Sequence, residues 1–200
     1  MRFRLLPRSF AALVVLLSLC SAHAQDSFRV ATYNVENYLE VPVSSRPAKS
    51  EASKAKVREV VKAMNADVIA FQEMGNTNAL LELRDSLKKD GLHYPYWDHV
   101  TGYDTNIHVA VLSKYPIMAR RSHTNENFLL SGRRFQVSRG FLEVDIKVKE
   151  DYTFTLMSAH LKSKRPVSYG DQEELRLEEA KLLRQKIDAR LAANPRANIV

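Results

Sequence analysis

Three hydrophobic runs of strand length in this chain each end in a short polar string. The strings occupy residues 32–37, 71–73 and 158–161 and read TYNVEN, FQE and SAHL. Each lies where a strand passes into a loop. Such points suit active sites in α/β enzymes, because the sheet fixes the backbone while the loop leaves the side chain accessible. An amide, two carboxylates and an imidazole at three strand ends suit the binding of a divalent metal and a phosphoester.

The spacing of apolar residues predicts strands alternating with helices at first and consecutive strands later. Strands are expected at residues 28–35, 67–73, 107–113, 142–148 and 152–161, with another beginning at 197–200. Helices are expected around residues 57–64, 80–87 and 180–191, where apolar residues recur every three or four positions. Residues 142–148 alternate apolar and charged side chains, which is typical of a strand with one face in water. The order of elements indicates an α/β fold with mixed sheets.

The N-terminus has the pattern of a cleavable secretory signal. Three arginines precede an apolar run over residues 10–19, and residues 22–24 read AHA. A transmembrane anchor is the rival interpretation, but a span needs about 18 apolar residues and this run is shorter. We therefore expect residues 1–24 to be a signal peptide. Residues 25–200 are then one domain of a protein secreted by a bacterium or held in its periplasm.

The one cysteine of the sequence, Cys20, lies inside this predicted signal peptide. Its acylation as a lipoprotein is disfavoured because the bulky Leu19 stands where a small residue is expected. A mature chain that starts at Gln25 has no disulfide, so its core must stabilise it, which fits a bacterial envelope protein. We expect a monomer without a membrane anchor.

The predicted mature chain is mildly basic. Cleavage removes three arginines and no acidic residue, which lowers the formal net charge from +7 to +4. This is not the charge of a protein coated for nucleic acid. Most basic residues fit a solvated surface, but Lys162, Lys164 and Arg165 differ because they directly follow His160.

Strand periodicity and ligand chemistry define the candidate site. Side chains two residues apart share a face of a strand, so Asn34 and Glu36 are expected to point the same way and Glu73 to continue the face of Phe71. Magnesium favours one or two carboxylates together with water and phosphate oxygens, which Glu73 and Glu36 would provide. His160 suits a phosphate oxygen better than zinc. Taken alone, each residue is more often a solvated carboxylate or a structural histidine, so only their combination indicates a site.

Five ordered segments make the combination specific. Residues 29–37, 66–73, 109–117, 138–144 and 158–164 read RVATYNVEN, ADVIAFQE, VAVLSKYPI, SRGFLEV and SAHLKSK. In this order they resemble the endonuclease/exonuclease/phosphatase superfamily, the group of pancreatic-type deoxyribonucleases, abasic-site endonucleases, inositol-phosphate phosphatases and sphingomyelinases. The resemblance implies a four-layer α/β sandwich, with two mixed sheets face to face and helices outside. It also implies phosphoester hydrolysis that depends on Mg²⁺, or on Mn²⁺ in its place.

The resemblance also implies residue roles. Glu73 matches the metal-binding glutamate of the family, and Asn34 matches the strand-end asparagine that orders the metal and phosphate site. Glu36 stands where some members keep an acidic residue near the metal. His160 matches the histidine that contacts the scissile phosphate, so His160 and Asn34 are the catalytic candidates. The candidate phosphate contacts are Arg139, Lys162 and Lys164.

The chain departs from the family pattern at its end. The next family motif, Gly-Asp-x-Asn, and a later Ser-Asp-His would follow the strand that begins near Ala197, and the sequence stops at Val200 before either. We therefore expect the C-terminal part of the fold to be missing and the chain as given to be inactive. The expected reaction is in-line attack of water on a metal-bound phosphate, with an aspartate beyond Val200 as general base.

Three functions remain open from the sequence. The basic clusters favour a nuclease or phosphodiesterase that acts on DNA or RNA, whose phosphate contacts would be sensitive to salt. A phosphatase or phosphodiesterase for a small molecule or a lipid would use the same core. A non-catalytic binding module would keep the fold and lose the site, which the retained Asn34, Glu73 and His160 argue against.

Overall fold

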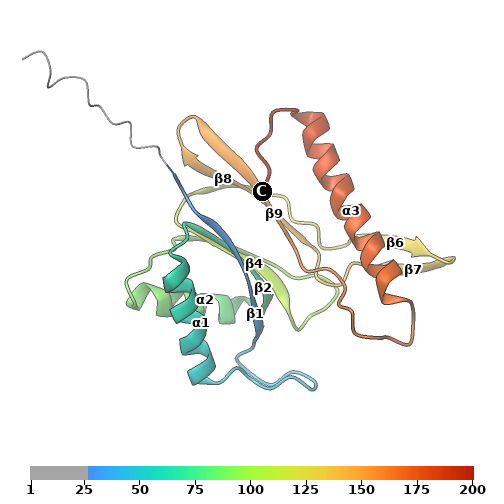
Figure 1. The fold of residues 1–200 in the computed structure, drawn as a ribbon, viewed down its shortest axis with the longest axis horizontal. Helices are drawn as coiled ribbons and strands as arrows, with labels where there is room; N and C mark the ends of the chain where they lie inside the picture. The colour runs from blue at the N-terminus through green and yellow to red at the C-terminus, as the bar shows by residue number, and fades with distance from the viewer. Residues whose placement is uncertain (1–26) are drawn as a thin grey trace, which may run out of the picture.

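Two β-sheets lie against each other in the computed structural model, which describes residues 27–200 (Figure 1). The predicted signal peptide, residues 1–24, lies outside the described residues. The first sheet and its helices comprise β1 (Val30–Tyr38), α1 (Glu51–Met64), β2 (Val68–Met74), α2 (Thr77–Lys89), β3 (Tyr96–Val100) and β4 (His108–Ser113). The remaining elements are β5 (Ile117–Arg120), β6 (Asn127–Leu130), β7 (Arg133–Gln136), β8 (Phe141–Lys149), β9 (Tyr152–Ala159) and α3 (Gln172–Ala193).

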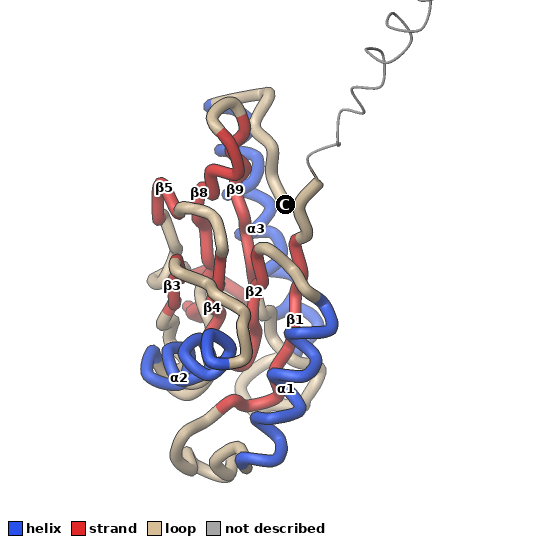
Figure 2. The backbone as a smooth tube through the Cα atoms, turned by 90° about the vertical axis from the view of Figure 1, so that its left-hand side faces the viewer, coloured by secondary structure: helices blue, strands red, loops and turns tan. Residues whose placement is uncertain are grey.

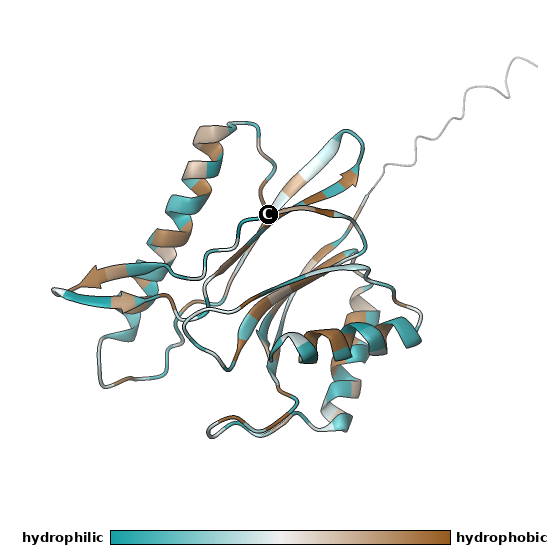
Figure 3. Cartoon of the chain, turned by 180° about the vertical axis from the view of Figure 1, so that it is seen from behind, coloured by the Kyte–Doolittle hydropathy of each residue, from teal (hydrophilic) through white to brown (hydrophobic). Residues whose placement is uncertain are grey.

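The first sheet is mixed, as predicted, with the strand order β1-β2-β4-β3. β1 and β2 are parallel and joined through α1, whereas β4 is antiparallel to both of its neighbours. The helices α1 and α2 pack on its outer face, where Val57, Val61 and Leu83 meet Ile69 and Phe71 in one buried cluster. Figure 3 shows the helices as alternating apolar and polar bands, as expected for elements that bury one face.

A second core cluster lies between the two sheets. The second sheet has the order β5-β8-β9, and its named strands are antiparallel. Val68 and Ala70 of the first sheet pack there against Leu142, Val144 and Phe154 of the second. The predicted strand at residues 197–200 appears as a short parallel bridge alongside β9, because Thr155 pairs with Ile199. The second sheet is therefore antiparallel apart from this bridge.

The outer face of β8 differs from its prediction as a wet face. Glu143 is only 2% exposed. Its carboxylate accepts hydrogen bonds from Arg121 (2.7 Å) and pairs with Arg190 of α3 (3.2 Å). Asp145 also pairs with both arginines. Charged residues on this strand mark a face covered by α3 rather than by water. Figures 1 and 2 show α3 on the opposite side of the molecule from α1 and α2.

A smaller cluster joins the β6–β7 hairpin to the second sheet and α3. Phe128, Val137 and Phe141 pack there against Leu175 of α3. This packing sets the position of α3, and it also fixes the segment between β7 and β8. In the part of the chain that the structure describes, no helix is long and apolar enough to cross a membrane.

Candidate active site

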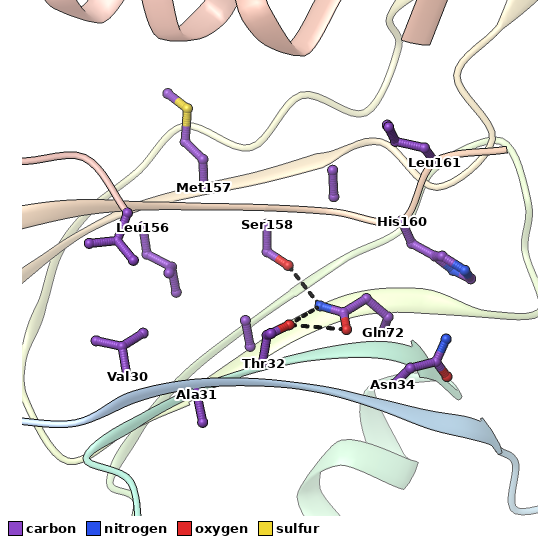
Figure 4. Close-up of a pocket in the computed structure, with 13 residues that line it drawn as sticks. Val30, Ala31, Thr32, Asn34, Gln72, Leu156, Met157, Ser158, His160 and Leu161 are labelled. Atoms are coloured by element: carbon purple, nitrogen blue, oxygen red, sulfur yellow. Dashed lines mark hydrogen bonds between the residues drawn. The ribbon is translucent and has the colours of Figure 1, made fainter. Parts of the chain in front are cut away.

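The three polar strings meet at one end of the two sheets. β1 and β2 are parallel neighbours, with Asn34 paired to Gln72 in the ladder, so their carboxyl ends lie side by side. β9 ends next to them. The Gln72 side chain spans the two sheets, since its Nε2 lies 3.0 Å from Thr32 Oγ1 and 3.2 Å from Ser158 Oγ (Figure 4).

Glu73 is the centre of the site. Asn34 Nδ2 donates to Glu73 Oε1 (3.1 Å), and the backbone N–H of Asn37 donates to Glu73 Oε2 (3.1 Å). The Nε2 atom of His160 lies 3.6 Å from Glu73 Oε1. Both carboxylate oxygens are thus fixed from β1 while the ring at the end of β9 approaches one of them.

Irregular backbone aims these side chains. Ile69 and Phe71 face the helices, and simple strand alternation would send Glu73 to the same side. Glu73 instead has φ 59° in an irregularity of the β2 register and contacts Asn34 and the ring of His160. The prediction that Glu73 continues the face of Phe71 is therefore wrong, because the left-handed residue breaks the alternation.

A second irregularity lies at Glu36 and Asn37. Glu36 and Asn37 have φ values of 49° and 55°, within the register shift of β1. Asn34 Oδ1 accepts the backbone N–H of Glu36 (2.9 Å). The exposed Glu36 side chain lines a surface pocket together with Lys49. Asn34 lines this pocket as well, but of Asn34 and Glu36 only Asn34 has a hydrogen bond to Glu73.

A pocket of about 290 Å³ opens beside Glu73 and His160, and we call it the Glu73 pocket. Its lining residues are Asn37, Arg46, Glu73, Ile107, Arg139, His160, Lys162, Ser163 and Arg165. Four of these side chains are cationic and one is an acid. The pocket therefore attracts anions around a single carboxylate.

The environment keeps the His160 ring neutral. Burial lowers the pKa of His160 below its usual value, the nearby Arg139 lowers it further, and Glu73 opposes both. The ring is therefore uncharged at neutral pH, with one N–H to donate. Its Nδ1 is buried and has no hydrogen-bond partner within residues 27–200.

Arg139 is held in the pocket by close backbone packing. It is 8% exposed, and its Nε lies 3.5 Å from Asp104 Oδ2. A Cβ on Gly102 would lie 2.4 Å from the Arg139 carbonyl carbon, and Gly140 has φ 67° with its own Cβ position 2.5 Å from a backbone oxygen. These two glycines let the backbone approach closely enough to place Arg139 in the wall of the pocket.

The buried Glu179 of α3 joins the two segments that carry Arg139 and Lys162. Its Oε1 accepts the backbone N–H of Ser138 (3.2 Å), and its Oε2 accepts that of Lys162 (2.5 Å). Burial raises the pKa of Glu179, and these two hydrogen bonds oppose the rise. Burial and Arg139 also lower the pKa of Lys162.

The structure brings together most of the residues predicted from the sequence. Glu73, His160, Arg139 and Lys162 line one pocket, and Asn34 contacts Glu73 from outside it. The two predicted residues that neither line the Glu73 pocket nor form a hydrogen bond with Glu73 are Glu36, which lines another pocket together with Asn34, and the exposed Lys164.

Three further residues escaped the sequence analysis. Asn37 belongs to the first polar string, and its place at the string's end was the available signal. Arg46 and Glu179 carried no signal, because a loop and a distant helix bring them to the site.

The donor set fits a hard divalent cation. Glu73 supplies a carboxylate, and the amide oxygen of Asn37 is buried without a hydrogen-bond partner in the described chain. Mg²⁺ commonly takes one or two carboxylates and completes its shell with water and phosphate oxygens. Residues 27–200 contain no group of three or more His, Cys, Asp and Glu side chains arranged for a metal. A site here would thus rely on solvent and substrate for its other ligands.

The model of the Endonuclease/Exonuclease/phosphatase family matches residues 31–200. No curated protein matches the sequence. Many solved structures share the fold at low sequence identity.

Three of these structures illustrate the likeness. A truncated TDP2 from Caenorhabditis elegans is 20% identical with a TM-score of 0.59, and the match covers 86% of this chain and 59% of that one. Sphingomyelinase C from Streptomyces griseocarneus is 21% identical with a TM-score of 0.56, over 82% and 59%. A β-hairpin deletion mutant of beta toxin from Staphylococcus aureus is 19% identical with a TM-score of 0.52, over 80% and 62%. The chain thus spans about three fifths of the length of each of these proteins, and the likeness establishes the fold.

Proposed function

Because this chain belongs to the endonuclease/exonuclease/phosphatase family, we propose that the Glu73 pocket serves a metal-dependent phosphodiesterase whose preferred substrate is a nucleic acid. The observation that carries this proposal is the composition of the pocket. One carboxylate lies 3.6 Å from the nitrogen of a neutral imidazole, and four cationic side chains surround them. A phosphodiester is negatively charged, and further negative charge develops on its oxygens in the transition state of hydrolysis. A pocket lined by cationic side chains therefore suits it.

Glu73 and Asn37 would hold the cation. Mg²⁺ or Mn²⁺, when bound, supplies Lewis-acid polarisation of the phosphate. Asn34 donates to Glu73 Oε1 and so fixes the carboxylate before substrate arrives. Its own amide oxygen already accepts the backbone N–H of Glu36, which favours an orienting role over direct metal contact.

His160 and the basic side chains would bind the phosphate itself. A neutral imidazole donates one N–H to a nonbridging oxygen without repelling a cation at Glu73. Arg139 and Lys162 offer charge-assisted hydrogen bonds to the equatorial oxygens, on which negative charge is spread during in-line attack by water. Because these groups are already fixed, they favour the transition state at little reorganisation cost.

The charge of the pocket favours a nucleic acid over a lipid headgroup. A phosphocholine headgroup ends in a cation, which gains nothing beside Arg46, Arg139, Lys162 and Arg165. A nucleic acid strand instead presents further phosphates to them. Its binding should therefore weaken as salt rises, since bound counterions are released on association.

A panel of substrates tests this proposal with the full-length protein and Mg²⁺. The panel contains double-stranded DNA, bis(p-nitrophenyl) phosphate, p-nitrophenyl phosphate and sphingomyelin vesicles. We expect hydrolysis of DNA and of the simple diester, with DNA cleavage falling steeply as NaCl rises from 50 to 200 mM, a range over which phosphate contacts lose much of their affinity. Faster cleavage of the monoester or of sphingomyelin would contradict the substrate, and no hydrolysis of any of them would indicate a binding module.

Export is the second part of the proposed function. It is supported by the arginines, the apolar run and the AHA string of residues 1–24. N-terminal sequencing of protein recovered from the periplasm or medium should begin at Gln25 or within about two residues of it. A mature chain that retains Arg2, or one acylated at Cys20, would contradict export as a soluble protein.

A further inference from the structure

A second pocket of about 420 Å³ adjoins the Glu73 pocket, and we call it the Arg46 pocket. The two pockets share Asn37, Arg46 and Arg165 as lining residues. The remaining wall of the Arg46 pocket consists of Ser44, Ser45, Pro47 and Asn106. A ligand in the Glu73 pocket can therefore extend past the two arginines into a polar space without an acidic side chain.

Arg46 projects from a fixed point. Its backbone exchanges two hydrogen bonds with Val43, each 2.9 Å, and Ser44 between them has φ 54°. This closed turn holds the arginine at the border of the two pockets. Its charge also reaches the site, because it helps to lower the pKa of His160.

The two guanidinium groups at this border are free. Neither Arg46 nor Arg165 has a side-chain hydrogen bond or an ion pair with any residue from 27 to 200, whereas Arg139 beside them lies against Asp104. An arginine presents five N–H donors in a planar fork that matches phosphate, and two such forks with two serine hydroxyls and an amide form an anion site.

We propose that the Arg46 pocket binds a second phosphate group of the substrate, next to the phosphodiester that is cut in the Glu73 pocket. This inference rests on the proposed function and narrows it to substrates with at least two phosphates. The second phosphate comes either from the neighbouring nucleotide of a strand or from a small molecule with two phosphates.

Matched pairs of ligands test this inference. The dinucleotides pTpT and TpT share one diester and differ by one terminal phosphate. Thymidine 3′,5′-bisphosphate and thymidine 3′-phosphate form the small-molecule pair. Binding to the full-length protein is measured calorimetrically in EDTA at constant low salt, and hydrolysis of pTpT, TpT and bis(p-nitrophenyl) phosphate is measured with Mg²⁺.

The variant is Arg46→Gln/Arg165→Gln, and its matched control is Lys88→Gln/Lys89→Gln. The control removes the same charge from the last turn of α2, which lies at the other end of the sheet from Glu73. Wild type should bind pTpT about 10–100-fold more tightly than TpT, the range given by one charge-assisted hydrogen bond. The first variant should lose this ratio and the control should keep it. For each of the substrates TpT and bis(p-nitrophenyl) phosphate, the control variant should hydrolyse it at a rate similar to that of wild type.

The outcomes separate the inference from the proposed function. Equal binding within both ligand pairs by wild type, or a ratio that the first variant keeps, overturns the inference, and the proposed function stands if bis(p-nitrophenyl) phosphate is still cut. If wild type cuts no diester, the proposed function fails, and the binding ratio in EDTA still decides whether the pocket holds a phosphate. If only Arg46→Gln/Arg165→Gln loses the affinity ratio, the inference is supported. The ligand pair with the larger ratio in wild type then shows whether the second phosphate belongs to a nucleic acid strand or to a small molecule.

Discussion

At the scale of the residue, the site depends on side chains held in uncommon backbone conformations. Glu36, Asn37 and Glu73 all have positive φ, and none of them is glycine. Each such residue costs about 1–3 kcal/mol, and such strain concentrates where function requires a particular geometry. Here the three residues place an asparagine N–H against one oxygen of Glu73 and turn the other oxygen toward Asn34.

His160 tests the chemistry of the site. Its replacement by alanine should lower kcat on bis(p-nitrophenyl) phosphate by about 10²–10⁴-fold, because a positioned acid or hydrogen-bond donor is lost. The thermal unfolding midpoint should change little, since within residues 27–200 the ring forms no hydrogen bond and only approaches Glu73 to 3.6 Å. Wild-type kcat in His160→Ala would remove His160 from the reaction.

The pH profile tests why His160 is neutral. Burial and Arg139 lower the pKa of His160, so its neutral form should persist below pH 6.5 and the acid limb of log kcat/KM should lie below that value. Arg139→Gln removes a nearby cation, and the limb should then move to higher pH in addition to any loss of rate. If the acid limb stays at the same pH in Arg139→Gln, Arg139 does not lower the pKa of the group that titrates there.

At the scale of the element, α3 organises the site from a distance. Its Glu179 ties Ser138 to Lys162, and its Arg190 covers the outer face of β8. The alternation of apolar and charged residues correctly predicted that Leu142 and Val144 are buried, but it could not predict that Glu143 is also buried. The sequence pattern of a single strand does not tell which element packs against its charged face, and here that element is α3.

Glu179→Gln tests this role of α3. Glutamine has one acceptor oxygen where glutamate has two, so the N–H of Ser138 or of Lys162 loses its partner. The free energy of unfolding should fall by about 1–3 kcal/mol, and kcat/KM should fall because Arg139 and Lys162 are no longer held. The control Glu178→Gln removes an acid paired with the exposed Lys181 and should change stability by less than about 0.5 kcal/mol. Equal effects of the two variants would contradict the role of Glu179.

At the scale of the whole molecule, the polar strings predicted the end of the sheets at which the candidate site lies. They identified Glu73, Asn34 and His160, because strands of one sheet bring their ends together. The second pocket was not predictable from periodicity. It is formed by Arg46, from a turn between β1 and α1, and by Arg165, from the loop after β9, and only the fold joins these two loops.

Acid stability tests the fold as a whole. His108 is 2% exposed, and its ring packs at a tilt against that of His99; burial and His99 lower the pKa of His108 to about 4, while Asp104 opposes them. The unfolded chain takes up a proton near pH 6.5 and the folded chain does not. Between pH 7 and pH 4 this group should therefore cost about 3 kcal/mol of stability. Denaturant unfolding at both pH values should show a smaller loss in His108→Leu, and equal losses would contradict a buried neutral His108.

The dependence of diester hydrolysis on divalent metal and on Glu73 tests the central claim most directly. Hydrolysis of bis(p-nitrophenyl) phosphate by the full-length protein is followed in EDTA and after addition of Mg²⁺ or Mn²⁺, for wild type, Glu73→Gln and the exposed control Glu40→Gln. We predict that EDTA abolishes the activity of wild type and that either metal restores it. Glu73→Gln should be at least about 10²-fold slower at every metal concentration and should remain folded, although glutamine leaves the N–H of Asn34 or of Asn37 without its acceptor. Glu40→Gln should match wild type. Full activity in EDTA, or wild-type activity in a folded Glu73→Gln protein, would contradict the claim.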